Sequence, residues 1–268
     1  MATATVSHDA CPAPQTYHTI WLNDSWPEAP VPDAVRPAVD SWRQHHPDAT
    51  HMHWDGVATE RLLSEDYPSY RDAFVALETE TQRSDLLRLL VLHKHGGTYV
   101  DVDVVCKAPQ LGAWARAGGT ANMAVIESPL FCEMLSTCYM SAVTPGDPFW
   151  LKVADEICAS AQGVRTGTRL SAPAARWMHL PLLGWFVRCV ATGATTGPGA
   201  LERTICRLAL QGDTPGLVVL AADRYYRGDL AVHEEHGGWF GAKARGVMAR
   251  LFLVGVAAFM AAAAASIP

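Results

Sequence analysis

The chain has 268 residues, of which 49% are hydrophobic and 18% are charged, and its formal net charge is −6. This length and composition fit one globular domain with a sizeable core and exclude an intrinsically disordered chain. The negative charge and the lack of a Lys/Arg cluster argue against nucleic acid as a partner. Seven cysteines without a CxxC pair predict no zinc site and require no disulfide framework.

The first part of the chain predicts a tail, a helix and a strand. Residues 1–15 contain proline, cysteine and aspartate but no apolar segment, so they predict a flexible tail and not a secretion signal. Ala38 to Trp54 predicts a helix followed by a strand. His51 and His53 are two residues apart on that strand, a spacing that two metal ligands can have. Histidines on a strand are more often structural, which is the favoured interpretation here.

A pair of helices comes next. Thr59 to Leu77 predicts a helix with an interruption at Pro68. The helix after it carries a broad leucine face and ends at the pair Gly96-Gly97. Asp85 and Arg88 are three residues apart in this helix, so we expect both side chains to project from the same side.

An Asp-x-Asp segment follows the two glycines. Valines alternate here with Tyr99, Asp101 and Asp103, which is the period-two pattern of a strand. The two carboxylates therefore share one face, unless the strand bends at its end. Like charges this close repel each other, and a hard cation such as Mg²⁺ or Mn²⁺ removes that penalty. Asp-x-Asp alone also fits an exposed edge strand, but the ordered set of Ser-Asp-x-x-Arg, Gly-Gly-x-Tyr and Asp-x-Asp is far more specific.

The second half of the chain predicts further helices. Leu130 to Met140 and Phe149 to Ala161 both have helical patterns. Trp177 to Val190 is apolar with a proline and a glycine inside it, so it predicts a buried helix or a surface for a lipid acceptor or membrane. No internal repeat and no long low-complexity linker divides the sequence, which favours a single domain.

The C-terminus carries an uncharged, alanine-rich run from Leu251 to Ile267. As a helix it would span about 26 Å, slightly short of a ~30 Å hydrocarbon core. Residues 243–268 therefore predict a membrane-associated helix, with a packed helix of the domain as the alternative. Basic residues precede the run, and the positive-inside tendency would leave the rest of the chain in the cytosol.

These motifs resemble those of the DXD-type sugar-binding glycosyltransferases, family 32. The matching signature residues are Ser84, Asp85, Arg88, Leu92, Gly96, Gly97, Tyr99, Asp101 and Asp103. The likeness continues in Tyr17 to Leu22, Pro145 to Trp150, Thr196-Gly197-Pro198 and His233 to Trp239, so it covers residues 17–240. Two positions depart from the family pattern, because Asp147 replaces a histidine and Gly238 replaces a serine.

The resemblance implies a fold and a set of site residues. It implies an α/β, GT-A-like domain over residues 16–242, with a mixed, mainly parallel sheet between helices and a nucleotide site at the strands' carboxyl ends. The implied catalytic residues are Asp85, Arg88, Asp101 and Asp103. The implied metal ligands are Asp101, Asp103 and His233, with His236 as the next choice. The implied donor contacts are Ile20, Trp21, Asp85, Arg88, Gly97, Tyr99, Asp101 and Trp239.

The function implied by the resemblance is metal-dependent transfer of a sugar from a nucleotide sugar to a hydroxyl acceptor, with retention of configuration. The cofactor is Mn²⁺ or Mg²⁺. GDP-mannose is the favoured donor by analogy. UDP-hexoses stay open as donors, because the motif recognises the diphosphate and the sugar and does not select one nucleotide base. A glycan or a lipid-linked inositol is the expected acceptor. The resemblance implies a membrane-associated location at the Golgi or another endomembrane. Family members that work in the Golgi face the lumen, whereas the basic residues before the apolar run favour a cytosolic domain, so both orientations stay open.

Two other classes of protein compete with a transferase. A non-catalytic nucleotide-sugar or glycan-binding protein could retain the fold, and the departures at Asp147 and Gly238 favour it. The intact signature around Asp85 and Asp101 argues against that class. A metal-dependent phosphodiesterase would need more His and Asp ligands than this sequence groups together.

Overall fold

The structure is a computed structural model, and it describes residues 16–109, 121–128, 132–142, 144–165, 192–193, 195–213, 217–220, 228 and 231–234. Its strands are β1 (Thr16–Ile20), β2 (Thr50–Trp54), β3 (Gly97–Val100), β4 (Val104–Cys106), β5 (Ala121–Ser128), β6 (Cys132–Ala142), β7 (Leu217–Leu220) and β8 (Ala231–His233). Its helices are α1 (Arg36–His45), α2 (Gly56–Glu65), α3 (Pro68–Ala76), α4 (Glu80–His95), α5 (Pro148–Arg165) and α8 (Pro198–Leu210).

Several expectations from the sequence fall outside the described residues. They concern the tail at 1–15, the apolar segment at 177–190, His236, Gly238, Trp239 and the helix at 243–268. Within the part of the chain that the structure describes, no helix has the length and apolarity that a membrane crossing requires.

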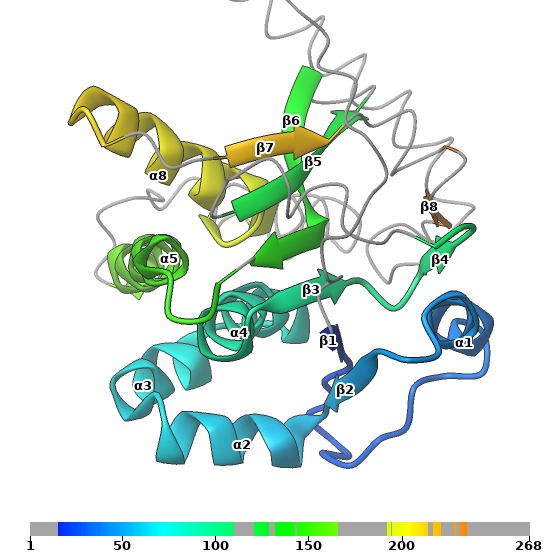
Figure 1. Cartoon of the computed structure of the whole chain (residues 1–268). Coiled ribbons are helices and arrows are strands. Elements are labelled where there is room, and N and C mark those ends of the chain that lie inside the picture. The colour runs from blue at the N-terminus through cyan, green and yellow to red at the C-terminus, as the bar shows by residue number, and fades with distance from the viewer. Residues whose placement is uncertain are drawn as a thin grey trace, which may run out of the picture.

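The larger sheet has six strands in the order β2-β1-β3-β6-β5-β7 (Figure 1). β1 runs parallel to both of its neighbours, and β5 runs parallel to β7. β6 is antiparallel to β3 and β5. Parallel pairings therefore outnumber antiparallel ones, and the expected α/β class with a mixed, mainly parallel sheet is confirmed. β4 and β8 form a separate two-stranded antiparallel sheet.

The sheet separates two hydrophobic clusters. Tyr99 packs into the cluster that contains α4 and α5, whereas its neighbour Val100 packs into the cluster around Trp42 of α1. Successive residues of a strand point to opposite faces, so the clusters lie on opposite sides of the sheet. The expected arrangement of a sheet between helices is confirmed.

Several predicted helices and strands are confirmed. The helix and strand expected between Ala38 and Trp54 are α1 and β2. The helix expected over Thr59 to Leu77 is split into α2 and α3, with Pro68 in the first turn of α3. Proline fits there because the first turn of a helix needs no amide donor from it. The helix expected over Phe149 to Ala161 is α5.

The helix predicted over Leu130 to Met140 is wrong, because the described part of this segment, residues 132–140, belongs to strand β6. β6 lies between β3 and β5. Residues 136–142 are buried apart from Thr137, so both faces of the strand are covered. A strand buried on both faces lacks the alternation that distinguishes it from a buried helix.

The turn between α4 and β3 needs both of its glycines. Gly96 and Gly97 have φ values of 63° and 81°, which places both in the left-handed region. A Cβ on Gly97 would lie 2.5 Å from the carbonyl oxygen of Thr16 in β1. The chain therefore passes directly from the end of α4 into the centre of the sheet.

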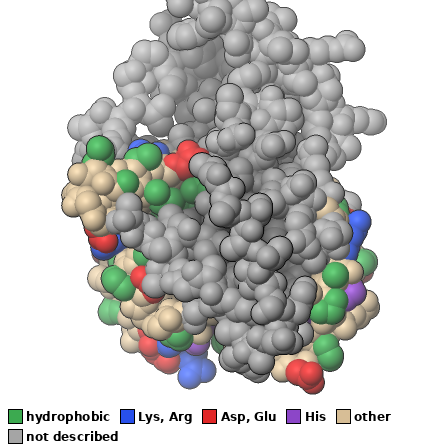
Figure 2. All heavy atoms as spheres, turned by 45° about the horizontal axis from the view of Figure 1, so that its top comes forward, with side chains coloured by type: hydrophobic (Ala, Val, Ile, Leu, Met, Phe, Trp, Pro, Cys, Tyr) green, Lys and Arg blue, Asp and Glu red, His purple; other side chains and the backbone are tan. Residues whose placement is uncertain are grey.

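The described surface mixes both signs of charge. Figure 2 shows both acidic and basic side chains among the described residues at the margins of the view. The large hydrophobic side chains that are exposed in the described part lie on different segments: Trp26, Val57, Val75 and Leu210.

Candidate active site

The two aspartates of the Asp-x-Asp motif meet in a turn. β3 ends at Val100, and the amide of Val104 donates to the carbonyl oxygen of Asp101 at 3.1 Å. The strand pattern therefore does not run straight through Val104: the bend at the strand's end, which the sequence left open, is present, since the chain turns at Asp101 and resumes as β4. The amide of Asp101 still donates to Cys138 of β6 at 2.8 Å, which fixes the start of the turn. The turn, and not strand alternation, brings the carboxylates of Asp101 and Asp103 together.

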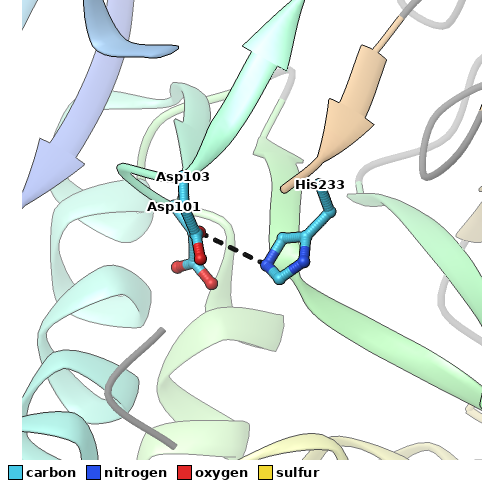
Figure 3. A group of neighbouring side chains, drawn as sticks. All are labelled: Asp101, Asp103 and His233. Carbon is cyan, nitrogen blue, oxygen red and sulfur yellow. Dashed lines mark ion pairs between the residues drawn. The ribbon is translucent and has the colours of Figure 1, made fainter. Parts of the chain in front are cut away.

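His233 joins the two aspartates through the small sheet of β4 and β8. Val104 lies opposite His233 in the register, and the amide of Glu234 donates to the carbonyl oxygen of Asp103 at 2.9 Å. Nε2 of His233 lies 3.3 Å from Oδ1 of Asp103 (Figure 3). One ligand atom from each of Asp101, Asp103 and His233 lies within 4.8 Å of the others. The three residues predicted as metal ligands are thus assembled in one place.

The donor set suits a divalent cation. Two carboxylates and one imidazole offer oxygen and nitrogen ligands at a spacing that a single ion can bridge. Asp103 and His233 are largely buried, while Asp101 is partly exposed. These three side chains would hold a cation, and Asp101 is the most exposed of them.

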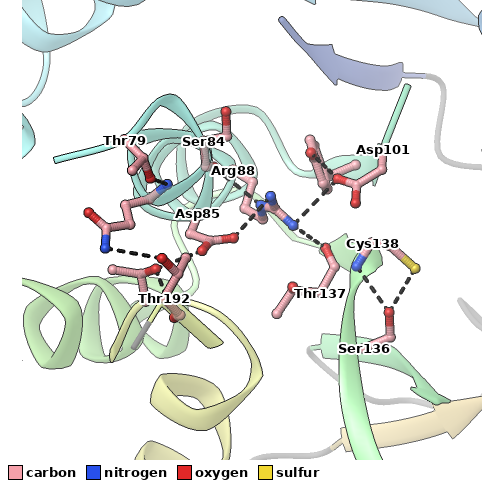
Figure 4. A network of polar contacts seen from close by, with 12 residues as sticks. Thr79, Ser84, Asp85, Arg88, Asp101, Ser136, Thr137, Cys138 and Thr192 are labelled. Atoms are coloured by element: carbon pink, nitrogen blue, oxygen red, sulfur yellow. Dashed lines mark hydrogen bonds and ion pairs between the residues drawn. The ribbon is translucent and has the colours of Figure 1, made fainter. Parts of the chain in front are cut away.

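Arg88 of α4 connects this cluster to Asp85. One terminal nitrogen of Arg88 lies 3.0 Å from Oδ1 of Asp85, and the other lies 3.5 Å from Oδ1 of Asp101 (Figure 4). The latter nitrogen also donates to the carbonyl oxygen of Thr137 at 2.6 Å. The expectation that Asp85 and Arg88 share one side of the helix is confirmed, and Arg88 additionally reaches the Asp-x-Asp turn.

Tyr99 supports both charged groups from β3. Its hydroxyl donates to Asp101, and its ring lies 4.6 Å from the guanidinium carbon of Arg88. The pKa of Tyr99 lies well above its usual value, mainly because the side chain is buried. The hydroxyl therefore stays protonated and remains a donor to the carboxylate.

Burial sets the protonation of the ion pair. It raises the pKa of Asp85 to about 6, against the lowering effects of Arg88 and of a hydrogen bond from Thr196. Burial also opposes the charge of Arg88, but Tyr99, Asp101 and Asp85 outweigh it and raise the Arg88 pKa above its usual value. At neutral pH both groups are charged, and Asp85 becomes neutral as the pH falls below about 6.

Thr196 is a contact that the sequence prediction did not assign. Its hydroxyl donates to Oδ2 of Asp85 at 2.7 Å, across 111 positions of sequence. The one sequence signal for it is the Thr-Gly-Pro segment that precedes α8, which the family resemblance includes without giving it a role.

The remaining predicted donor residues lie mostly at one edge of the sheet. β1 and β3 are parallel, so Trp21 after β1 and Asp101 after β3 follow carboxyl ends that meet at the same edge. Ile20 is buried in the core at the end of β1. Gly97 instead begins β3, at the opposite end from Asp101. The donor contacts of these residues stay predictions.

Two other sets of predicted positions are explained by local contacts. His51 bonds to the carbonyl oxygen of His46 at 3.1 Å, and Nδ1 of His53 is hydrogen-bonded to the hydroxyl of Thr19 at 3.1 Å, so neither joins the metal cluster. Asp147 accepts from the amide of Phe149 at 2.9 Å, directly before α5 begins. The departure from the family pattern at Asp147 is therefore a helix cap.

Comparison with known proteins agrees with this geometry. Residues 32–117 match the family model described as glycosyltransferase sugar-binding region containing DXD motif. The resemblance to the DXD glycosyltransferases is confirmed. The matched range contains α4 with Asp85 and Arg88 and the turn with Asp101 and Asp103, while His233 lies beyond it.

Curated relatives are similar over short stretches. Inositol phosphoceramide mannosyltransferase 2 of Schizosaccharomyces pombe is 29% identical over 86 residues, which are 32% of this chain and 25% of that protein. Mannosyl phosphorylinositol ceramide synthase CSH1 of Saccharomyces cerevisiae is 32% identical over 62 residues, which are 23% of this chain and 16% of that protein. The chain thus spans about a quarter or less of the length of these two relatives.

Solved structures with a distant likeness carry glycosyltransferase titles. The UDP-bound glycosyltransferase domain from the YGT toxin has a TM-score of 0.47 at 12% identity, covering 78% of this chain and 79% of that one. PaToxG glycosyltransferase has a TM-score of 0.44 at 17% identity, covering 73% of this chain and 70% of that one.

Proposed function

We propose that this chain is a metal-dependent glycosyltransferase that moves a hexose from a nucleotide sugar to a hydroxyl acceptor, with retention of configuration. The observation that carries the proposal is one connected network, in which Arg88 contacts both Asp85 and the Asp101 of the metal cluster. A donor molecule has a diphosphate next to a sugar. The proposal is supported by the matching order of this network, in which the cluster that we propose as the cation site is linked through Arg88 to a buried carboxylate.

Each side chain has a defined task in this proposal. Asp101, Asp103 and His233 hold Mn²⁺ or Mg²⁺, and a cation there supplies positive charge for the diphosphate of the leaving nucleotide. The imidazole favours Mn²⁺ over Mg²⁺, which prefers oxygen ligands. Asp85 accepts hydrogen bonds from hydroxyls of the donor sugar. Arg88 orients both carboxylates, because its nitrogens are engaged with them and with backbone carbonyls.

Mannose and a glycolipid are the proposed donor sugar and acceptor. The names of the relatives, inositol phosphoceramide mannosyltransferase and mannosyl phosphorylinositol ceramide synthase, support both choices. GDP-mannose remains the favoured donor, with UDP-hexoses as the alternative. Trp239 is proposed as a further donor contact.

We propose three segments of the chain: a tail at 1–15, a glycosyltransferase domain at 16–242 and an apolar helix at 243–268. The last segment is proposed as an anchor at the Golgi or another endomembrane.

A panel of nucleotide sugars tests the activity. The full chain should release nucleoside diphosphate from GDP-mannose in the presence of Mn²⁺, and excess EDTA should abolish this hydrolysis. Asp103→Ala should abolish it too, because that variant removes one of the three ligands, while the exposed Asp33→Ala should behave as the unaltered chain does. Full activity in Asp103→Ala or in EDTA would overturn the metal assignment. Tight binding of a donor without any turnover would favour the non-catalytic binding protein.

Sedimentation tests the proposed anchor. The full chain should pellet with membranes, and a chain that ends at Gly241 should stay in the supernatant and still hydrolyse the donor. If the full chain stays in the supernatant without detergent, residues 251–267 do not form an anchor.

A further inference from the structure

The carboxylate of Asp85 is held at both of its oxygens. Arg88 contacts Oδ1 at 3.0 Å, and the hydroxyl of Thr196 donates to Oδ2 at 2.7 Å. All three side chains are buried. The two contacts come from different parts of the fold, since Arg88 shares helix α4 with Asp85 and Thr196 lies just before α8. A carboxylate held at two points cannot rotate about its own axis without breaking one of the contacts.

Thr196 is itself fixed by a tight turn. The amides of Thr196 and Gly197 both donate to the carbonyl oxygen of Thr192, at 2.9 and 3.0 Å. The side-chain amide of Gln82 in α4 donates to the hydroxyl of Thr192 at 3.2 Å. Figure 4 shows Thr192 beside α4, near Asp85. Thr192 and Thr196 are thus both attached to α4, through Gln82 and through Asp85 respectively.

The hydroxyl of Thr196 has one proton and two acceptors within reach. Oδ2 of Asp85 lies at 2.7 Å and the carbonyl oxygen of Thr192 lies at 3.2 Å. The shorter contact is to a carboxylate, and hydrogen bonds to a charged acceptor are the stronger ones. The proton is therefore directed to Asp85.

We propose that Thr196 is a positioning residue of the donor-sugar site, whose hydroxyl fixes the carboxylate of Asp85 in the orientation that binds the hydroxyls of the sugar. This inference rests on the proposed function, because it takes Asp85 as a sugar ligand. It extends that function to the second half of the chain: the sugar site is complete only when the turn before α8 has docked on α4.

A packing role and a positioning role for Thr196 predict opposite results for two substitutions. Thr196→Val keeps the shape of the side chain and removes the hydroxyl, whereas Thr196→Ser keeps the hydroxyl and removes a methyl group. If only packing matters, the serine variant is the impaired one. If the hydroxyl positions Asp85, the valine variant is impaired. Thr204→Val is a matched control, because this buried hydroxyl of α8 donates to the carbonyl oxygen of Ala200 at 2.9 Å, away from Asp85.

The experiment measures donor hydrolysis and nucleotide binding in these variants. Thr196→Val should lower kcat/KM for the nucleotide sugar about 10- to 100-fold, the size expected for one hydrogen bond to a charged group. Its affinity for the nucleoside diphosphate alone should be unchanged, because that ligand lacks the sugar. Thr196→Ser and Thr204→Val should stay within about threefold of the unaltered chain. Normal hydrolysis by Thr196→Val, or equal losses in the valine and serine variants, would overturn the inference.

A second readout separates this inference from the proposed function. NMR of the Asp85 carboxyl carbon measures the pKa of Asp85, which is about 6 in the unaltered chain. This pKa should be higher in Thr196→Val, because the hydrogen bond from Thr196 lowers the pKa of Asp85. In Thr196→Ser, which keeps the hydroxyl, the pKa should equal that of the unaltered chain. If the unaltered chain hydrolyses no donor, the proposed function fails by itself, and an unchanged Asp85 titration in Thr196→Val would then reject the role of Thr196 independently.

Discussion

The guanidinium of Arg88 lies 3.5 Å from the carboxylate of Asp101, although one residue belongs to the middle of a helix and the other to a turn after a strand. The same guanidinium holds Asp85 at 3.0 Å. The group that orients the proposed sugar ligand therefore also orients a proposed metal ligand. A change in Arg88 should disturb both halves of the site at once.

Arg88→Lys should lower kcat/KM for the donor by about 100-fold or more, and the free energy of unfolding should fall by about 1–3 kcal/mol. A lysine ammonium is a single point and cannot contact both carboxylates and the backbone carbonyls that the planar guanidinium reaches. Donor hydrolysis and urea unfolding measure the two effects. Arg61→Lys is the control, because its exposed pair with Glu65 should contribute less than about 0.5 kcal/mol. Equal activity in the two variants would contradict the bridging role.

His233→Ala should weaken Mn²⁺ binding by about tenfold or more, because it removes one ligand and leaves two carboxylates that repel each other. Manganese EPR measures this without any turnover. His51→Ala serves as a control, since His51 lies on β2 outside the cluster and bonds to a backbone carbonyl. If both variants bind Mn²⁺ as the unaltered chain does, His233 is not a ligand.

The shared side of Asp85 and Arg88 and the end of α4 at the two glycines could be predicted from the sequence, because both depend on residues close together in the chain. The three-residue spacing of Asp85 and Arg88 fixes their common side, and two glycines in succession mark the end of α4. The Asp-x-Asp turn was less predictable. Period two in the sequence predicted a strand and left a bend at its end open, and the hydrogen bond from Val104 to Asp101 shows where the chain bends.

Long-range contacts were not accessible to the same reasoning. Thr196 contacts Asp85 across 111 positions, and no periodicity encodes that distance. His233 was assigned by resemblance alone, since its place beside Asp103 depends on the pairing of β4 with β8. The helix expected at Leu130 to Met140 failed for a related reason: β6 lies inside the sheet, and hydrophobic clusters on the two sides of the sheet bury both of its faces and remove its alternation.

Gly97→Ala should destabilise the fold by about 3 kcal/mol or more. Its φ of 81° costs an alanine about 1–2 kcal/mol, and the new Cβ would lie 2.5 Å from the carbonyl oxygen of Thr16. Gly146→Ala is a matched control, because Gly146 has the same φ of 81° and a Cβ there would meet no atom within 4 Å. The difference between the two variants in urea unfolding isolates the contact with β1. Equal losses would contradict the close approach.

Stability should fall as the pH decreases from about 6.5 to about 4, with His18 as one cause. His18 is fully buried, bonded to Gly96 at 2.9 Å and to the indole of Trp54 at 3.3 Å. Burial lowers its pKa from 6.5 to about 4. The unfolded chain therefore takes up a proton first, and the folded state loses about 3 kcal/mol across this window. His18→Gln should flatten the dependence by about that amount, measured as unfolding free energy against pH; an unaltered slope would exclude His18 as the source.

Asp147→Ala should cost about 1 kcal/mol of stability and leave the specific activity of the folded protein unchanged. The carboxylate of Asp147 accepts from the amide of Phe149 at the start of α5, so alanine removes a helix cap. Asp147→Asn keeps an acceptor and should stay within about 0.5 kcal/mol. Thermal unfolding and donor hydrolysis of both variants measure the two properties separately. A large loss of activity in a folded Asp147→Ala would give this position a role in the reaction, and would mean that the family's histidine and this aspartate serve the site directly.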